Sequence, residues 1–134
     1  MALKNTTTPI TIRFNDIDLA GHVHNSVYLH YFELGRIDFF NTLISEKRDW
    51  KKEGVIIGRN EIDYLRPITF QDDLYINTFT ENIGNKSITV GYNVFIKQNK
   101  QEITCAKGKS VLVCFNFETN KSVEVFEEWK KVLM

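Results

Sequence analysis

Residues 25–43 read NSVYLHYFELGRIDFFNTL and decide the fold of this chain. Large apolar residues and one glycine recur with the spacing of a single helix face. They are Tyr28, Phe32, Gly35, Phe39 and Leu43. Asn25 or Ser26 can cap the first turn, and apolar residues on the remaining sides predict a long helix that is almost fully enclosed. Gly35 costs such a helix about 1 kcal/mol relative to alanine, so we expect another backbone to approach closely there.

Strands are predicted both before and after this helix in the sequence. Upstream, Ile10, Ile12 and Phe14 alternate with polar residues, as in a half-buried strand. Downstream, apolar segments separated by turn residues predict four more strands, the third of which has a hairpin loop on each side. These strands span residues 55–65, 74–80, 87–96 and 102–117, and the loops span residues 82–86 and 97–101. This order predicts an α+β protein in which an antiparallel sheet of about five strands wraps around one long helix.

The composition indicates one soluble domain over residues 1–134, without internal repeats or linkers. The 17 basic and 17 acidic side chains balance, so the chain lacks the long-range field of a nucleic-acid or anionic-membrane binder, and neither partner is expected. Cys105 and Cys114 lie in one apolar stretch and are expected to be buried free thiols in a reducing cytoplasm. No apolar run predicts a secretory segment or a membrane span, and no sequence pattern predicts nucleotide hydrolysis, dinucleotide binding or a serine hydrolase.

Two segments of the chain resemble one enzyme family. Residues 13–33 read RFNDIDLAGHVHNSVYLHYFE, and residues 62–74 read IDYLRPITFQDDL. The first resembles the signature of hotdog-fold thioesterases related to 4-hydroxybenzoyl-CoA thioesterase, in which an aromatic residue precedes D-x-D-x-x-G-H-V, N-x-x-Y and F-E. The second resembles the later strand-turn-strand element of that family, although Gln71 stands where the family often has glycine. The resemblance implies a hotdog fold and hydrolysis of an acyl-CoA thioester to a carboxylic acid and CoA.

The resemblance places the catalytic carboxylate on Asp18, the second aspartate of D-x-D. A carboxylate can attack the thioester carbonyl as a nucleophile, or it can activate a water molecule as a general base. Backbone N–H groups at the start of the helix, on Asn25, Ser26 and Val27, are expected to polarise the carbonyl. Asp16 is expected to be a structural turn residue.

Two histidines follow the aspartates, and each has an alternative role. Asp18, His22 and His24 are all possible metal ligands, but three ligands on one short loop lack a defined geometry. The resemblance implies neither a metal nor a cofactor. His22 either orients the carboxylate or braces the loop. Asn25 occupies a position where some relatives carry histidine, and its side-chain amide is expected to position water or the thioester.

Several other residues are candidates for substrate contact or for structural support. Tyr28 either lines the acyl pocket or belongs to the core. Arg59, Arg66 and Lys86 are candidates for binding the phosphates of CoA. Glu33 lies among the apolar residues of the helix and is expected to have a partner.

Two other functions and the state of assembly remain open from the sequence. An acyl group carried by acyl carrier protein would need a basic docking patch, and a non-catalytic acyl-binding module would have no need of Asp18. An open sheet leaves its edges uncovered, so we expect a dimer or a tetramer of two dimers. The resemblance implies that both protomers contribute to each site.

Overall fold

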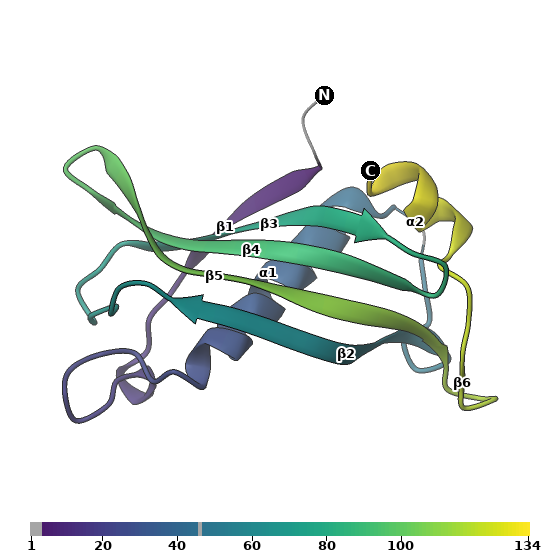
Figure 1. Ribbon diagram of the computed structural model, residues 1–134, viewed down its shortest axis with the longest axis horizontal. Helices are drawn as coiled ribbons and strands as arrows, with labels where there is room; N and C mark the ends of the chain where they lie inside the picture. The colour runs from purple at the N-terminus through teal and green to yellow at the C-terminus, as the bar shows by residue number, and fades with distance from the viewer. Residues whose placement is uncertain (1–3, 46) are drawn as a thin grey trace.

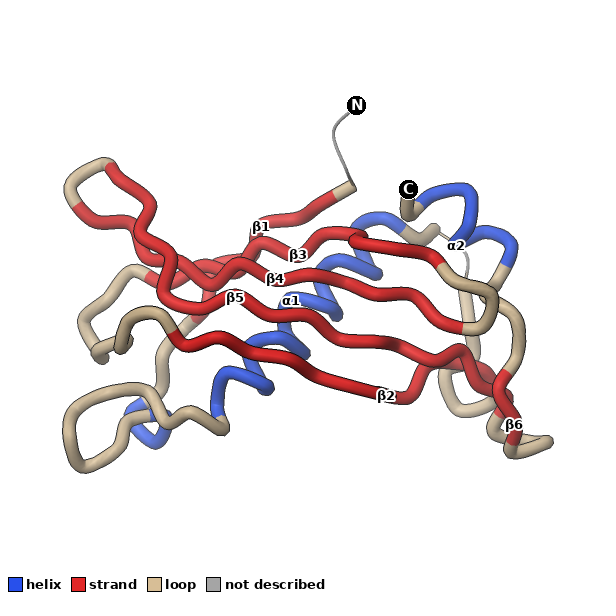
Figure 2. Tube along the Cα trace, viewed as in Figure 1, coloured by secondary structure: helices blue, strands red, loops and turns tan. Residues whose placement is uncertain are grey.

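A computed structural model of the protein describes residues 4–45 and 47–134, which form one sheet with a long helix across one face (Figures 1 and 2). The strands are β1 (Asn5–Ile10), β2 (Glu53–Tyr64), β3 (Leu74–Ile83), β4 (Ser87–Gln98), β5 (Gln101–Asn116) and β6 (Lys121–Ser122). The helices are the short 3-10 helix η1 (Phe14–Asp16), α1 (Val27–Leu43) and α2 (Glu127–Val132).

The sheet is antiparallel throughout, in the order β1-β3-β4-β5-β2, with the short β6 paired to the end of β5. β1 and β2 are therefore the edge strands. α1 runs diagonally across one face, as Figure 1 shows, and contacts β1 and β3. The predicted α+β hotdog architecture of about five strands around one long helix is confirmed.

The hairpin predicted between the last two long strands is tight. Asn99 and Lys100 have φ angles of 52° and 63° and join β4 directly to β5. Two consecutive left-handed residues twist the chain in the same sense as the strands, which favours such two-residue hairpins.

The prediction of a strand reaching Phe14 is wrong. β1 ends at Ile10, and Phe14 lies in η1 with its side chain 83% exposed. The Asp16 carboxylate accepts a hydrogen bond from the Arg13 backbone at 2.9 Å, which bends the chain into a turn. Ile10 and Ile12 do point into the core, so the alternation holds for only part of the segment.

α1 is enclosed on one side only. A Cβ on Gly35 would lie 2.5 Å from the Thr78 hydroxyl and 3.2 Å from the Ile76 side chain, so the close neighbours are side chains of β3 and not the backbone that was predicted. Leu29 and Ile37, by contrast, are 40% and 50% exposed, because no other element of the described chain covers that side of the helix. Glu33 is exposed as well and has no hydrogen bond or ion pair within the described residues, so its expected partner is absent from this part of the chain.

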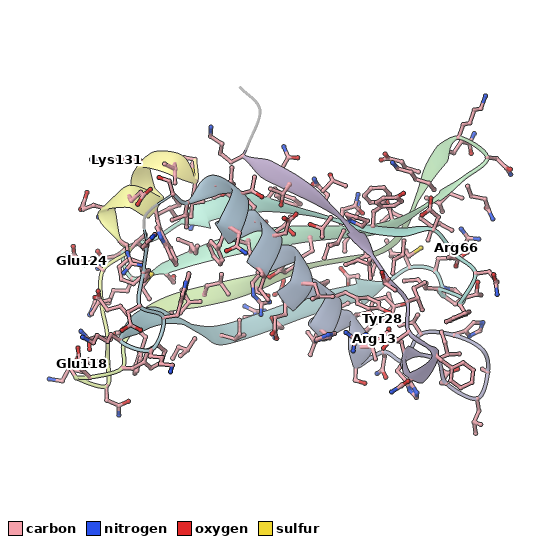
Figure 3. The ribbon with its side chains drawn as sticks, turned by 180° about the vertical axis from the view of Figure 1, so that it is seen from behind. Arg13, Tyr28, Arg66, Glu118, Glu124 and Lys131 are labelled. Carbon is pink, nitrogen blue, oxygen red and sulfur yellow. The ribbon has the colours of Figure 1, made fainter. Side chains whose placement is uncertain are left out.

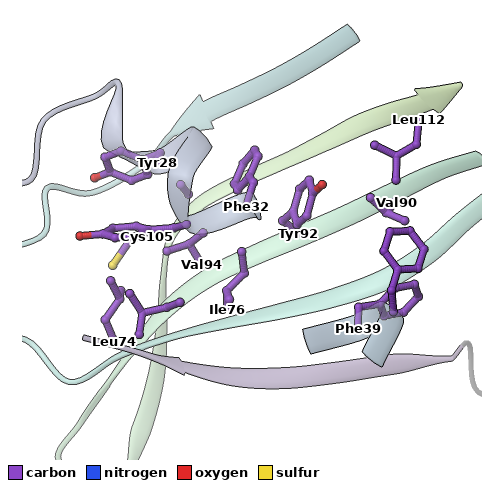
Figure 4. Packing of buried hydrophobic residues seen from close by; sticks show 14 of the residues in the cluster. Tyr28, Phe32, Phe39, Leu74, Ile76, Val90, Tyr92, Val94, Cys105 and Leu112 are labelled. Carbon is purple, nitrogen blue, oxygen red and sulfur yellow. The ribbon is translucent and has the colours of Figure 1, made fainter. Parts of the chain in front are cut away.

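The core lies between α1 and the sheet (Figure 4), and α2 packs against it at one end (Figure 1). Trp129 of α2 is fully buried, and its ring stacks on Phe40 at 5.0 Å between centroids. Cys105 and Cys114 are buried free thiols, as predicted. Within the described residues no helix is long and apolar enough to cross a membrane.

Candidate active site

The loop that carries Asp18 is folded around its carboxylate. Oδ1 of Asp18 accepts hydrogen bonds from the backbone N–H groups of Ala20 at 2.9 Å and His22 at 3.1 Å. The Asp18 N–H donates in return to the His22 carbonyl at 2.8 Å. Gly21 closes the turn at φ 84°, a conformation that costs glycine little. An aspartate that accepts from the backbone two residues later is a typical turn former, so the local sequence fixes this geometry.

Asp16 holds the same loop against α1. Its Oδ2 accepts hydrogen bonds from the Arg13 N–H at 2.9 Å and from the Tyr31 hydroxyl at 2.8 Å. Its own carbonyl accepts from the His24 N–H at 2.8 Å. These bonds occupy a nearly buried carboxylate, in keeping with the structural role expected for Asp16.

The two segments that resemble the thioesterase family lie side by side. The Val23 N–H donates to the Ile68 carbonyl at 2.8 Å, and His22 forms an isolated antiparallel bridge with Thr69. Gln71 stands where the family often has glycine, and the turn before β3 accommodates it. Its φ angle is negative, so the backbone there does not require glycine.

A cavity of about 440 Å³ opens where these segments meet. Tyr64, Leu65 and Pro67 of the second segment line it, and the sequence offered neither Leu65 nor Pro67 as a site residue. Figure 3 shows Tyr28 and Arg66 at the same end of the molecule, opposite Glu118 and Glu124. The site candidates that the structure brings together at this cavity are Asp18, His22, Asn25, Tyr28 and Arg66.

The carboxylate of Asp18 is ionised at neutral pH. The hydrogen bond from the His22 backbone holds its pKa below the ordinary aspartate value, with smaller contributions from the Ala20 N–H and the nearby His24 and His22 side chains. Partial desolvation acts in the opposite direction without reversing the shift. An ionised carboxylate at the wall of a cavity is in the state that either nucleophilic attack or base catalysis requires.

The backbone at the start of α1 supplies fewer free donors than predicted. The Val27 N–H already donates to the His24 carbonyl at 3.1 Å, so Val27 is not available to a substrate. The N–H groups of Asn25 and Ser26 have no acceptor within the described chain. The Asn25 carbonyl accepts a hydrogen bond from the Tyr64 hydroxyl at 3.1 Å, a contact across 39 positions that no local pattern indicates.

The three basic candidates have different surroundings. Arg66 lines the cavity, and its Nη1 is buried without a hydrogen-bond partner in the described residues. Arg59 is on β2 and forms an ion pair with Glu61 instead. The turn between β3 and β4 contains Lys86 and lies at the other end of the sheet from the Asp18 loop (Figure 1). Neither Arg59 nor Lys86 lines the cavity, so their contact with CoA stays a prediction.

The two histidines lie on different sides of the loop. The His22 side chain is half-buried and lines the cavity, and its backbone braces the loop, so its orienting role stays a prediction. His24 is exposed and borders a second hollow of about 540 Å³, which Asp18 and Leu19 also line. Across residues 4–45 and 47–134 there is no group of three or more histidine, cysteine or acidic side chains that could hold a metal ion.

A family profile matches almost the whole chain. The profile of the thioesterase-like superfamily covers residues 12–133. The chain belongs to the thioesterase-like superfamily. The class expected from the resemblance, a thioester hydrolase, is therefore confirmed.

Solved structures agree with this assignment. A predicted thioesterase from Bacillus stearothermophilus is 32% identical, with 96% of this chain and 93% of that chain covered and a TM-score of 0.79. A thioesterase from Thermus thermophilus, solved with coenzyme A and zinc, is 30% identical, with 98% of each chain covered and a TM-score of 0.79. A 4-hydroxybenzoyl-CoA thioesterase mutant bound to 4-hydroxybenzoyl-CoA has a TM-score of 0.88 over 98% of this chain and 99% of its own. At 16% identity, that last similarity is one of fold.

Proposed function

We propose that this superfamily member hydrolyses an acyl-CoA thioester to a free carboxylic acid and CoA, with Asp18 as the catalytic carboxylate. The observation that carries the proposal is the ionised Asp18 carboxylate, fixed by two backbone N–H groups at the wall of a cavity that the start of α1 also lines. The Thermus thermophilus relative, solved with coenzyme A, supports CoA as the thiol part of the substrate.

Asp18 has two possible roles in this reaction. As a nucleophile, its carboxylate adds to the thioester carbonyl, the CoA thiolate leaves, and water hydrolyses the resulting acyl anhydride. As a general base, it takes a proton from the water that attacks the carbonyl directly. In both routes negative charge develops on the carbonyl oxygen, and we assign its stabilisation to the N–H groups of Asn25, which lines the cavity, and of the adjacent Ser26, since neither has an acceptor within the described chain.

We further propose that the protein works as a dimer, or as a tetramer of two dimers, in the cytoplasm. β2 is a twelve-residue edge strand whose Ile56 and Ile57 are 40% and 42% exposed. The open side of α1 exposes Ile37 as well. A second copy paired along this edge would cover both surfaces and bring further residues to the cavity. The two buried free thiols support a reducing compartment.

The test is release of CoA thiol from short, medium, long and aromatic acyl-CoAs by the wild type and by Asp18→Asn. Asp49→Asn is a matched control, because Asp49 accepts the same kind of backbone bond, from the Lys51 N–H at 3.1 Å, in an exposed loop elsewhere. We expect turnover in the wild type and the control, and loss of about 10²-fold or more in kcat for Asp18→Asn, with CoA binding retained.

Two results would contradict the proposal. Undiminished turnover in Asp18→Asn would assign the chemistry to another residue. A folded wild type that hydrolyses none of the acyl-CoAs would refute an acyl-CoA substrate and direct attention to acyl carrier protein or to a binding role.

A further inference from the structure

Three tyrosines surround the Asp18 loop, and one of them has an unused hydroxyl group. The Tyr31 hydroxyl donates to Asp16 at 2.8 Å, and the Tyr64 hydroxyl donates to the Asn25 carbonyl at 3.1 Å. The Tyr28 hydroxyl makes no hydrogen bond within the described residues, although the tyrosine as a whole is only 3% exposed. Its oxygen is not among the fully buried polar atoms that lack a partner in the described chain, so the ring is buried while the hydroxyl opens to the cavity and is free to bind a ligand.

The ring of Tyr28 is held in a fixed orientation. It packs edge-on against Tyr64, with 5.0 Å between ring centroids, and lies 6.3 Å from the ring of Tyr31. Figure 4 shows its hydroxyl end turned away from Phe32 and the centre of the core. Tyr28 lines the same cavity as Asp18, and no hydrogen bond joins the two side chains. The hydroxyl is therefore a preorganised group at the wall of the catalytic cavity.

The protonation state of Tyr28 suits a hydrogen-bond donor. Burial raises the pKa of its phenol to about 12, with smaller contributions from Cys105 and Tyr64. The group consequently stays neutral and keeps its proton from the acid pH at which Asp18 ionises up to strongly alkaline pH.

We propose, on the basis of the function proposed above, that Tyr28 is a further catalytic residue whose hydroxyl donates a hydrogen bond to the carbonyl oxygen of the bound thioester. It adds a side-chain donor to the backbone N–H groups of Asn25 and Ser26. Its position in the first turn of α1 places it beside those groups in sequence, and it lines the same cavity as Asn25.

The step balances without transfer of the tyrosine proton. When the Asp18 carboxylate or an activated water adds to the carbonyl carbon, the π electron pair moves to the oxygen, and the hydrogen bond from Tyr28 strengthens. When that pair returns to re-form the carbonyl, the carbon–sulfur bond breaks and its electrons leave on the CoA sulfur as a thiolate. Tyr28 begins and ends the cycle as a neutral phenol.

The test compares Tyr28→Phe with the wild type in steady-state hydrolysis of the best acyl-CoA substrate. We expect kcat to fall about ten- to a hundredfold with KM nearly unchanged, because the bond strengthens mainly in the transition state and backbone donors share the charge. Tyr75→Phe is the matched control, because it removes a hydroxyl bonded to Asp73 outside the cavity. Melting temperatures of both variants report whether either substitution disturbs the fold.

A second measurement separates donation from mere packing. Site-specific replacement of Tyr28 by 3,5-difluorotyrosine keeps the ring and lowers the pKa of its hydroxyl. We expect activity to be lost at alkaline pH where the wild type stays active, since the ionised phenol cannot donate. A packing role predicts the same pH profile for both proteins.

The outcomes distinguish this inference from the function on which it rests. Wild-type turnover together with an unchanged kcat in Tyr28→Phe, or an unshifted pH profile in the fluorinated protein, overturns the role of Tyr28 alone. A wild type without turnover on any acyl-CoA overturns the proposed function and the role of Tyr28 with it.

Discussion

Removing the Tyr31 hydroxyl should loosen the loop that carries Asp18. Tyr31 is 1% exposed and donates at 2.8 Å to the carboxylate of Asp16, a residue that is itself 9% exposed. In Tyr31→Phe this carboxylate keeps only the Arg13 N–H, and water has little access to replace the lost donor. Asp16 and Asp18 are separated by one residue, so a shift in the first carboxylate reaches the second.

The size of the effect follows from the burial of the pair. A hydrogen bond to a charged group contributes about 1.5–3 kcal/mol, and we expect Tyr31→Phe to lower the free energy of unfolding by that amount. With an unfolding entropy of about 2.1 cal/mol/K per residue, a chain of 134 residues loses roughly 3.6 °C of melting temperature per kcal/mol. The expected decrease in melting temperature is therefore about 5–11 °C.

The assay is urea unfolding of four proteins at one fixed protein concentration: wild type, Tyr31→Phe, Asp16→Ala and the double variant. Fixed concentration matters because assembly contributes to the stability of an oligomer. If the hydrogen bond is responsible, Tyr31→Phe costs much less in the Asp16→Ala background than in the wild type. A loss below about 0.5 kcal/mol in the single variant, or equal losses in both backgrounds, would refute the reasoning.

Three further predictions follow from other contacts. Gly35→Ala should lower the free energy of unfolding, measured by urea denaturation, by roughly 1–2 kcal/mol, because the new Cβ would approach the Thr78 hydroxyl to 2.5 Å. Adding Thr78→Ala should recover part of that loss. A thiol reagent should modify Cys105 and Cys114 on the order of a hundredfold more slowly in the folded protein than in urea, because both are buried and burial raises the pKa of each thiol. Equal rates would show that the thiols are accessible. The pKa of Asp18 is lowered mainly by the hydrogen bond from the His22 backbone, so kcat/KM should persist as pH falls and be lost only below the ordinary pKa range of aspartate, when the carboxylate is protonated. A loss of activity centred near pH 6 would assign the acid limb to another group.

Local sequence patterns predicted most of the fold correctly. The helical spacing in residues 25–43 gave α1, and the apolar alternation gave the four later strands to within a few residues. The prediction failed at Phe14, because alternation alone does not reveal that the Asp16 carboxylate ends the strand. It also failed for the enclosure of α1, since the apolar residues on its open side are covered by nothing in the described part of one chain.

The sequence identified candidate residues for the site, but it did not show which of them lie at the cavity. Asp18, Gly21 and the backbone that caps the carboxylate form a local turn, so a motif of a few residues specifies them. The distance between Arg59 and the cavity depends instead on strand order and register, which no short segment encodes.

The sequence by itself determined the types and order of the helices and strands, the position of the catalytic carboxylate candidate and the resemblance to thioesterases. These features depend on periodicity and on short motifs, whose interactions span a few residues. Only the tertiary structure decided which hydrogen-bonding groups are free. It gave the Tyr64 hydroxyl an acceptor in the Asn25 carbonyl, left the N–H groups of Asn25 and Ser26 unpaired within the described chain, and left the Tyr28 hydroxyl open at the cavity. The physical reason is that a polar group also finds partners far along the chain, as the Tyr64 hydroxyl does 39 positions away, and only the folded chain shows which distant groups come close.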